Sequence, residues 1–159
     1  MRAPVWLLLL VSVLVCAGCG PDVDLTKGLQ VEIVSTGWFD VGVVNGQNKL
    51  VPSVSFRLKN VSEQKLSALQ VTARFSRVSE TDEWGNGFVI IADALKPGAT
   101  TATLTAKSLI GYTGSAESRA EMLQNPHFVD AKVLLSAKYG SIQWTHVGEY
   151  PIARQLVTK

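Results

Sequence analysis

The chain has 159 residues, with 15 lysines and arginines against 13 aspartates and glutamates, so its formal charge of +2 is nearly balanced. This balance favours neither a nucleic-acid surface nor an electrostatic membrane surface. The length suits one ordinary domain with a core large enough to fold alone. The two histidines stand apart from each other, and no compact set of nitrogen, sulfur and carboxylate ligands suggests a zinc site.

The N-terminal segment has the pattern of a secretory signal peptide. Arg2 supplies one positive charge, an uninterrupted apolar run extends from Val5 to Val15, and small residues precede Cys19. The apolar run is too short for a membrane-spanning helix, which needs about 20 residues. We therefore expect residues 1–18 to be a cleaved signal peptide, and a retained membrane helix is the less favoured interpretation.

The end of this segment, Ala17-Gly18-Cys19, resembles the lipobox of bacterial lipoproteins. The resemblance implies cleavage before Cys19 and a thioether between its thiol and diacylglycerol, with palmitate among the acyl chains. It also implies a protein held by lipid at a bacterial cell envelope, on the outer membrane if the cell is Gram-negative.

The resemblance also sets the expected domain limits. Residues 19–28 would be the lipidated cysteine and a polar tether, and residues 29–159 would form the folded domain. A C-x-x-C pair can also indicate a redox centre or, with a following histidine, an attached haem. Because Gly20 follows this pair and Cys16 lies in the expected signal peptide, both alternatives are disfavoured, and we expect no cofactor.

Beyond the tether, apolar and polar residues alternate with a period of two, which is typical of half-buried antiparallel strands. The pattern places Leu69, Val71, Ala73 and Phe75 on one face and Gln70, Thr72, Arg74 and Ser76 on the other. It likewise assigns Val54, Phe56, Leu58, Val133, Leu135, Ala137 and Tyr139 to the core, and Ser53, Ser55, Arg57 and Lys59 to solvent.

Turn residues divide the chain into about eight expected strands, at 29–36, 40–45, 49–60, 67–79, 87–92, 100–106, 130–139 and 142–152. The reversals fall at Asn45-Gly46, at Lys96-Pro97-Gly98 and at Gly140-Ser141. Short strands at regular spacing predict an all-β fold, an immunoglobulin-like antiparallel β-sandwich of seven or eight strands. A small barrel is the alternative.

One segment departs from this rhythm and predicts a short crossover helix at residues 116–124. Ser118 and Glu121 fit a capping box, and Asn125-Pro126 provides a stop. We expect this helix to cover one end of the sandwich.

The middle of the chain is similar to the FxLYD modules of bacterial surface proteins. The matching features are Asn60 in a turn, Phe75 near the end of a long strand, an acidic glycine-containing turn at 82–87 and a Leu-x-Pro-Gly turn at 95–98. The resemblance covers about 50 residues and implies a small β-sandwich.

No motif for catalysis is present. A serine nucleophile needs a positioned base, and no Gly-x-Ser-x-Gly sequence presents one. The acidic group Glu80, Asp82 and Glu83 lacks the spacing of a calcium loop and is better explained as a solvated turn. We therefore expect no enzyme and no metal site.

Aromatic residues in expected loops are the candidate partner contacts. Trp84 lies in the acidic turn, and Tyr112 precedes the expected helix. The alternative is that these rings cap the end of the core.

These features predict a lipid-anchored envelope protein that acts as a non-catalytic binding or assembly accessory. The soluble domain is expected to be monomeric, and an envelope protein is a candidate partner. The alternatives are a small-ligand or metal carrier and an envelope enzyme without a recognisable motif. Nucleic acid is not an expected partner.

Overall fold

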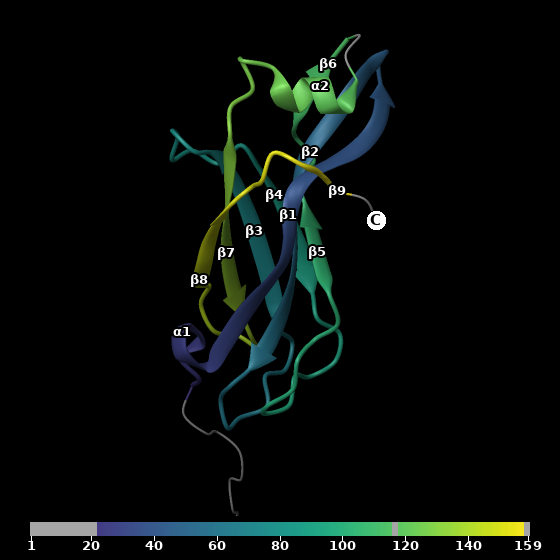
Figure 1. Ribbon diagram of the computed structural model, residues 1–159. Coiled ribbons are helices and arrows are strands. Elements are labelled where there is room, and N and C mark those ends of the chain that lie inside the picture. Colours follow the sequence, from purple (N-terminus) through teal and green to yellow (C-terminus); the bar gives the residue numbers. More distant parts are fainter. Residues whose placement is uncertain (1–21, 116–117, 158–159) are drawn as a thin grey trace, which may run out of the picture.

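The computed structural model describes residues 22–115 and 118–157, so the expected signal peptide and Cys19 lie outside the described residues. Two β-sheets pack face to face, which confirms the predicted all-β sandwich (Figure 1). The described strands are β1 (Leu29–Val44), β2 (Gln47–Asn60), β3 (Gln70–Arg77), β4 (Gly85–Ile90), β5 (Leu104–Lys107), β6 (Tyr112–Gly114), β7 (Ala131–Lys138), β8 (Thr145–Pro151) and β9 (Leu156–Val157).

The strand order is that of an immunoglobulin-like sandwich. The first sheet runs β5-β2-β1-β9, with β6 also paired to β2, and the second runs β4-β3-β7-β8. In immunoglobulin terms, β1, β2 and β5 correspond to strands A, B and E, and β4, β3, β7 and β8 correspond to C′, C, F and G. The pairing of β1 with β9 is parallel, and the other strand pairs are antiparallel.

The alternating pattern predicted the core correctly along three strands. The side chains assigned to the core on β2, β3 and β7 are fully buried: Val54, Phe56, Leu58, Val71, Ala73, Phe75, Val133, Leu135 and Ala137. The prediction is wrong for Ser53, which was assigned to solvent and is only 3% exposed. Ser53 lies beside Phe39 and Val157 in a hollow on the outer face of the first sheet.

The first two expected strands form one continuous strand, β1. Register shifts between Ile33 and Ser35 and between Asp40 and Gly42 absorb the irregularities that suggested a break. Between these shifts Trp38 is fully buried, whereas Phe39 lines the hollow on the outer face. The sequence Gly37-Trp38-Phe39 therefore lies within β1 and does not interrupt it.

The expected tether is too long at its C-terminal end. Residues Leu25–Gly28 form the short helix α1, capped by the Asp24 side chain, which accepts a hydrogen bond from the Thr26 backbone N–H. Leu25 is fully buried in the core. Because this side chain packs with the strands, the folded domain begins before residue 29.

Several strand limits also differ from expectation. The strand expected at 100–106 begins only at Leu104, the first residue of β5, and Thr100 makes an isolated bridge to Lys59. The strand expected from residue 142 begins at Thr145, the first residue of β8. The short strands β6 and β9 were not expected, because two or three residues show no periodicity.

The turn and helix predictions are confirmed. Backbone φ is positive at Asn45, Gly46, Gly98 and Gly140, as tight reversals require. Helix α2 spans Arg119–Gln124 and has the complete Ser118–Glu121 capping box. Residues 116–117, the first two of the expected helix, lie outside the described residues.

Helices α1 and α2 lie at opposite ends of the sandwich (Figure 1). At the α1 end, buried Asn60 donates to the carbonyls of Gln64 and Leu95, and its side-chain oxygen accepts from Ser62. This asparagine therefore fixes the connection between β2 and β3 beside α1. Within the described residues, no helix has the length and apolar character needed to cross a membrane.

Candidate functional site

Four aromatic rings from separate parts of the chain meet at the α2 end of the sandwich. Trp38 comes from β1, Trp84 from the residue before β4, Tyr112 from β6, and Phe128 from the loop after α2. The ring centroids of Trp38 and Phe128 are 4.6 Å apart, those of Tyr112 and Phe128 are 4.8 Å apart, and those of Trp84 and Tyr112 are 4.9 Å apart. We call these four residues the aromatic cluster.

Trp38 is the buried centre of the aromatic cluster. Its side chain is fully buried and contacts the other three rings. Its indole Nε1 has no hydrogen-bond acceptor among the described residues. A buried N–H without an acceptor is costly in free energy and is uncommon in native proteins.

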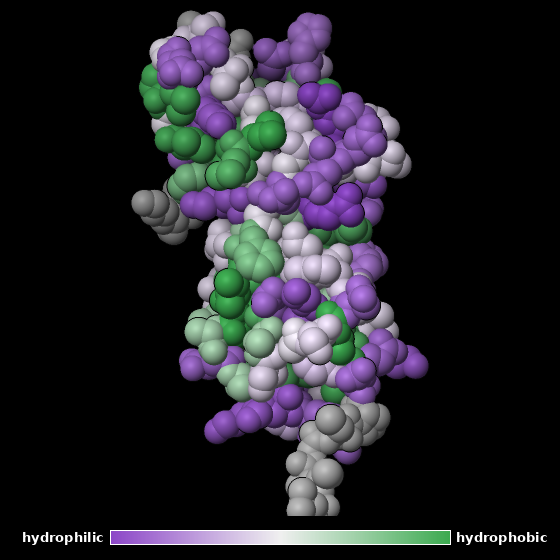
Figure 2. All heavy atoms as spheres, turned by 180° about the vertical axis from the view of Figure 1, so that it is seen from behind, coloured by the Kyte–Doolittle hydropathy of each residue, from purple (hydrophilic) through white to green (hydrophobic). Residues whose placement is uncertain are grey.

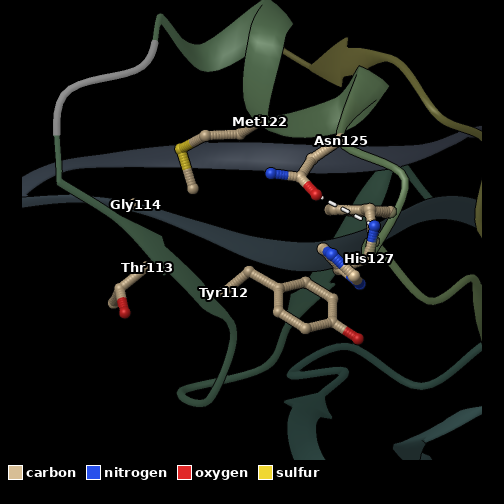
Figure 3. Close-up of a pocket in the computed structure, with 7 residues that line it drawn as sticks. Tyr112, Thr113, Gly114, Met122, Asn125 and His127 are labelled. Atoms are coloured by element: carbon tan, nitrogen blue, oxygen red, sulfur yellow. Dashed lines mark hydrogen bonds between the residues drawn. The ribbon is translucent and has the colours of Figure 1, made fainter.

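A hollow of about 160 Å³ opens beside the aromatic cluster, between β6, α2 and the loop that follows α2 (Figure 3). Its lining comprises Tyr112, Thr113, Gly114, Met122, Asn125, His127 and Phe128. The Met122 thioether and the two rings give it apolar walls, and the His127 backbone N–H donates to the Asn125 side chain at its rim. Apolar walls with a polar rim suit a bound group that has both apolar and polar parts.

Arg154 holds the loop that forms one wall of the hollow. Its guanidinium donates to the Asp130 carboxylate at 2.6 Å and to the Phe128 carbonyl at 3.0 Å. The guanidinium carbon also lies 5.2 Å from the centroid of the Phe128 ring. The pKa of Arg154 is raised, first because of the hydrogen bond to Asp130. This arginine therefore ties the loop to the segment before β9.

A second arginine supports Trp84 on the other side of the cluster. The Arg77 guanidinium carbon lies 5.5 Å from the centroid of the Trp84 ring, and Arg77 pairs with Glu80 at 3.0 Å. The pKa of Arg77 is raised, first by its hydrogen bond to Glu80 and then by one to Tyr112. The backbone N–H of Trp84 donates to the Phe75 carbonyl, which fixes the chain at the start of β4.

The two partner contacts expected from sequence, Trp84 and Tyr112, are thus brought side by side. Both rings are half-buried rather than free on loop tips, and the Tyr112 hydroxyl donates to the Val129 carbonyl at 3.2 Å. Sequence reasoning missed Met122, Phe128 and Arg154. No local sequence pattern marks Met122, Phe128 or Arg154 as a functional residue. A methionine in a helix or a single aromatic residue after a turn has no distinctive spacing.

Exposed aliphatic side chains lie on the segment before β6 and near the end of β1. Leu109 and Ile110, just before β6, are 83% and 50% exposed, and Val43, near the end of β1, is 65% exposed. Seen from behind, hydrophobic side chains gather at the α2 end of the molecule (Figure 2). Exposed apolar patches of this kind are common at protein interaction sites.

Titratable side chains in the described ranges do not gather into a metal-binding set. No group of three or more histidine, cysteine, aspartate and glutamate side chains that could hold a metal ion is found in residues 22–115 and 118–157. In the acidic turn, Glu83 pairs with Arg74 at 2.8 Å and accepts a hydrogen bond from Asn86, which lowers its pKa. His127 and His146 are both exposed and lie on different parts of the fold.

Comparison with known proteins identifies no family for this chain. Neither a known family nor a curated protein matches the chain. Among solved structures, Northeast Structural Genomics Consortium target SoR45 is similar, with a TM-score of 0.44, 12% identity, and coverage of 81% of this chain and 89% of that one. The ligand binding region of Serine-glutamate repeat protein A of Enterococcus faecium has a TM-score of 0.35, 15% identity, and coverage of 78% and 90%.

Proposed function

We propose that this chain is a lipid-anchored protein of the bacterial envelope whose β-sandwich is a non-catalytic binding or assembly module. The observation that carries the proposal is the position of the hollow, which is lined by residues of β6, α2 and the loop after α2. Helix α2 lies at the end of the sandwich opposite α1 (Figure 1). Only two residues lie between Cys19 and Asp22, so the three steps along the chain span at most about 10 Å when extended. A lipid on Cys19 would therefore hold the α1 end at the membrane and direct the hollow away from it.

The size of the hollow favours a protein partner over a carried small molecule. Ligand pockets usually enclose roughly 300–1,000 Å³ and bury most of the ligand, whereas this hollow encloses about 160 Å³. That volume suits one inserted side chain. The exposed Leu109, Ile110 and Val43 would supply the surrounding apolar contact.

Site-specific photocrosslinking in intact envelopes tests this proposal. A photoreactive residue replaces Thr113, which is exposed at the rim of the hollow, and in a matched control it replaces exposed Lys65 near α1. We expect one crosslinked protein band from position 113, identified by mass spectrometry, and no such band from position 65. Equal crosslinking from both positions, or none from either, would contradict the proposal.

A small-ligand carrier would give a different result. Native mass spectrometry of the purified chain would then show a bound small molecule, and position 113 would crosslink that molecule instead of a protein. This outcome would replace the assembly proposal with the carrier alternative.

A further inference from the structure

A second and larger hollow lies on the outer face of the first sheet. It encloses about 510 Å³ between β1, β2, β5 and β9. Five of its lining residues carry hydroxyl groups, and the others are Phe39, Lys107 and two valines. No residue of the hollow at the α2 end takes part in it.

Strand register builds this hollow. Ser53 lies opposite Lys107, and Ser55 lies opposite Thr105, so β2 and β5 present adjacent rows of polar side chains. Strand β9 forms the far wall because it passes closely over Gly37, where an added Cβ would lie 2.5 Å from a Val157 methyl carbon. Glycine at position 37 therefore allows β9 to take this place.

Among the described residues, Lys107 is a cation without a carboxylate partner. Its Nζ lies 3.6 Å from the centroid of the Phe39 ring, and none of the ion pairs among the described residues includes it. An aromatic ring stabilises the positive charge of an ammonium group only in part. A carboxylate would form a charge-assisted hydrogen bond with that group. The lining itself contains no acidic residue that would repel such a group.

The hydroxyl groups have hydrogen-bonding capacity beyond their contacts with one another. Ser55 and Thr105 share one hydrogen bond at 2.9 Å, and Thr103 accepts from the Arg57 Nε at 3.1 Å. Each hydroxyl has one donor and two acceptor positions, so these contacts leave several positions open to a ligand. Ser53 contributes a further hydroxyl at a nearly buried position.

This combination fits a sugar ring that carries a carboxylate. A pyranose has an apolar C–H face that can stack on Phe39 and a rim of hydroxyls that can bond to serine and threonine. Movement of the flexible Lys107 side chain off the Phe39 ring would expose the stacking surface and bring the ammonium to the ligand's carboxylate. A protein interface of ordinary size would need a larger apolar centre than one phenyl ring and two valines.

We propose that this hollow is a binding site for carboxylated sugars, with Phe39 as the stacking surface, Lys107 as the carboxylate contact, and Ser53, Ser55 and Thr105 as hydroxyl contacts. The site does not depend on the lipid anchor or on the hollow at the α2 end. Its failure would leave the proposed function untouched.

Isothermal titration of the purified full-length chain in detergent tests the site. The probe is polygalacturonate, and the controls are dextran, which has sugar rings without carboxylates, and polyglutamate, which has carboxylates without sugar rings. We expect polygalacturonate to bind at least tenfold more tightly than either control. Absence of polygalacturonate binding, or equal binding of polyglutamate, would overturn the proposal.

Two lysine variants then localise the binding. Lys107→Met removes the charge and keeps an apolar stem, and we expect at least a tenfold loss of affinity for polygalacturonate. Lys138→Met is the matched control, because Lys138 lies over an aromatic ring on the other sheet, with its Nζ 5.0 Å from the centroid of Trp144. Unchanged affinity in the Lys107 variant, or an equal loss in both variants, would contradict the assignment.

Discussion

The indole of Trp38 and the phenyl ring of Phe128 meet edge to face, with centroids 4.6 Å apart and planes inclined by 73°. This contact joins the first sheet to the loop after α2. Edge-to-face pairs contribute about 0.5–1.5 kcal/mol beyond the burial of their area. The two residues therefore couple the loop after α2 to the core of the sandwich.

A double-mutant cycle measures this coupling. Trp38→Leu and Phe128→Leu each lower the free energy of unfolding, because both side chains are buried. We expect the double variant to lose less than the sum of the single losses, by about 0.5–1.5 kcal/mol. Urea denaturation of the four proteins gives this value, and additive losses would show that the rings do not interact.

Phe75 and Phe88 form a matched pair for testing the core. Phe75 on β3 is fully buried, whereas Phe88 on the neighbouring strand β4 is 54% exposed. We expect Phe75→Ala to lower the free energy of unfolding by about 3–5 kcal/mol, and Phe88→Ala to change it by no more than about 1 kcal/mol. Equal losses in thermal or urea unfolding would mean that the second sheet has been assigned the wrong inner face.

Removal of the Arg154 side chain should loosen the wall of the hollow. Arg154→Met loses the bonds to Asp130 and to the Phe128 carbonyl. Because the Arg154 side chain is 42% exposed, solvent screening keeps the expected loss of stability small. Hydrogen exchange should become faster at residues 125–130.

Lys132→Met serves as the control for Arg154→Met, since Lys132 makes a single 3.4 Å contact with Glu149. That variant should cost about 0.5 kcal/mol or less and should leave exchange at residues 125–130 unchanged. Faster exchange in both variants would argue against a specific role for Arg154.

The capping box of α2 should respond to acid. The pKa of Glu121 is lowered from its ordinary value of 4.5, chiefly by a hydrogen bond from the Ser118 backbone. A carboxyl group with a lowered pKa in the folded state adds stability above 4.5 that is lost as the pH falls through the folded value. The protection factors of the α2 amides, corrected for the intrinsic exchange rate at each pH, should therefore fall below pH 4.5, and Glu121→Gln should remove this part of the acid dependence.

The proposed anchor is tested by changing the two cysteines separately. Cys19→Ser should abolish incorporation of labelled palmitate and either release the chain from membranes or leave it unprocessed, because stable attachment requires more than one buried acyl chain. Cys16→Ser should be nearly silent. Labelling that persists in the Cys19 variant would exclude Cys19 as the lipidated residue.

Part of the site at the α2 end could be anticipated from sequence. Trp84 and Tyr112 were candidate partner contacts because they are aromatic residues in expected loops, and their ring centroids lie 4.9 Å apart. Their half-buried packing against the core agrees with the alternative interpretation, in which these rings cap the end of the core. The ring of Trp38, on which both pack, faces inward only because β1 continues through residues 37–39.

Local sequence determined which faces of the strands are buried, where the chain reverses and how α2 begins. Alternation places Val71 and Phe75 on the same side of a strand, whichever strands lie beside it. Turns that need a positive φ favour glycine, which stands at positions 46 and 98. The capping box needs only Ser118 and Glu121. These features depend on residues a few positions apart, so the sequence contains them in full.

Only the tertiary structure decided the two hollows and the elements that border them. Strand β9 is two residues long and exists because it pairs with Trp38 and Phe39 of β1, more than a hundred positions earlier in the chain. The aromatic cluster likewise unites four separate segments, and Lys107 reaches Phe39 across β2. Such contacts depend on strand order and register, which follow from burying all the apolar faces at once rather than from any local run of residues.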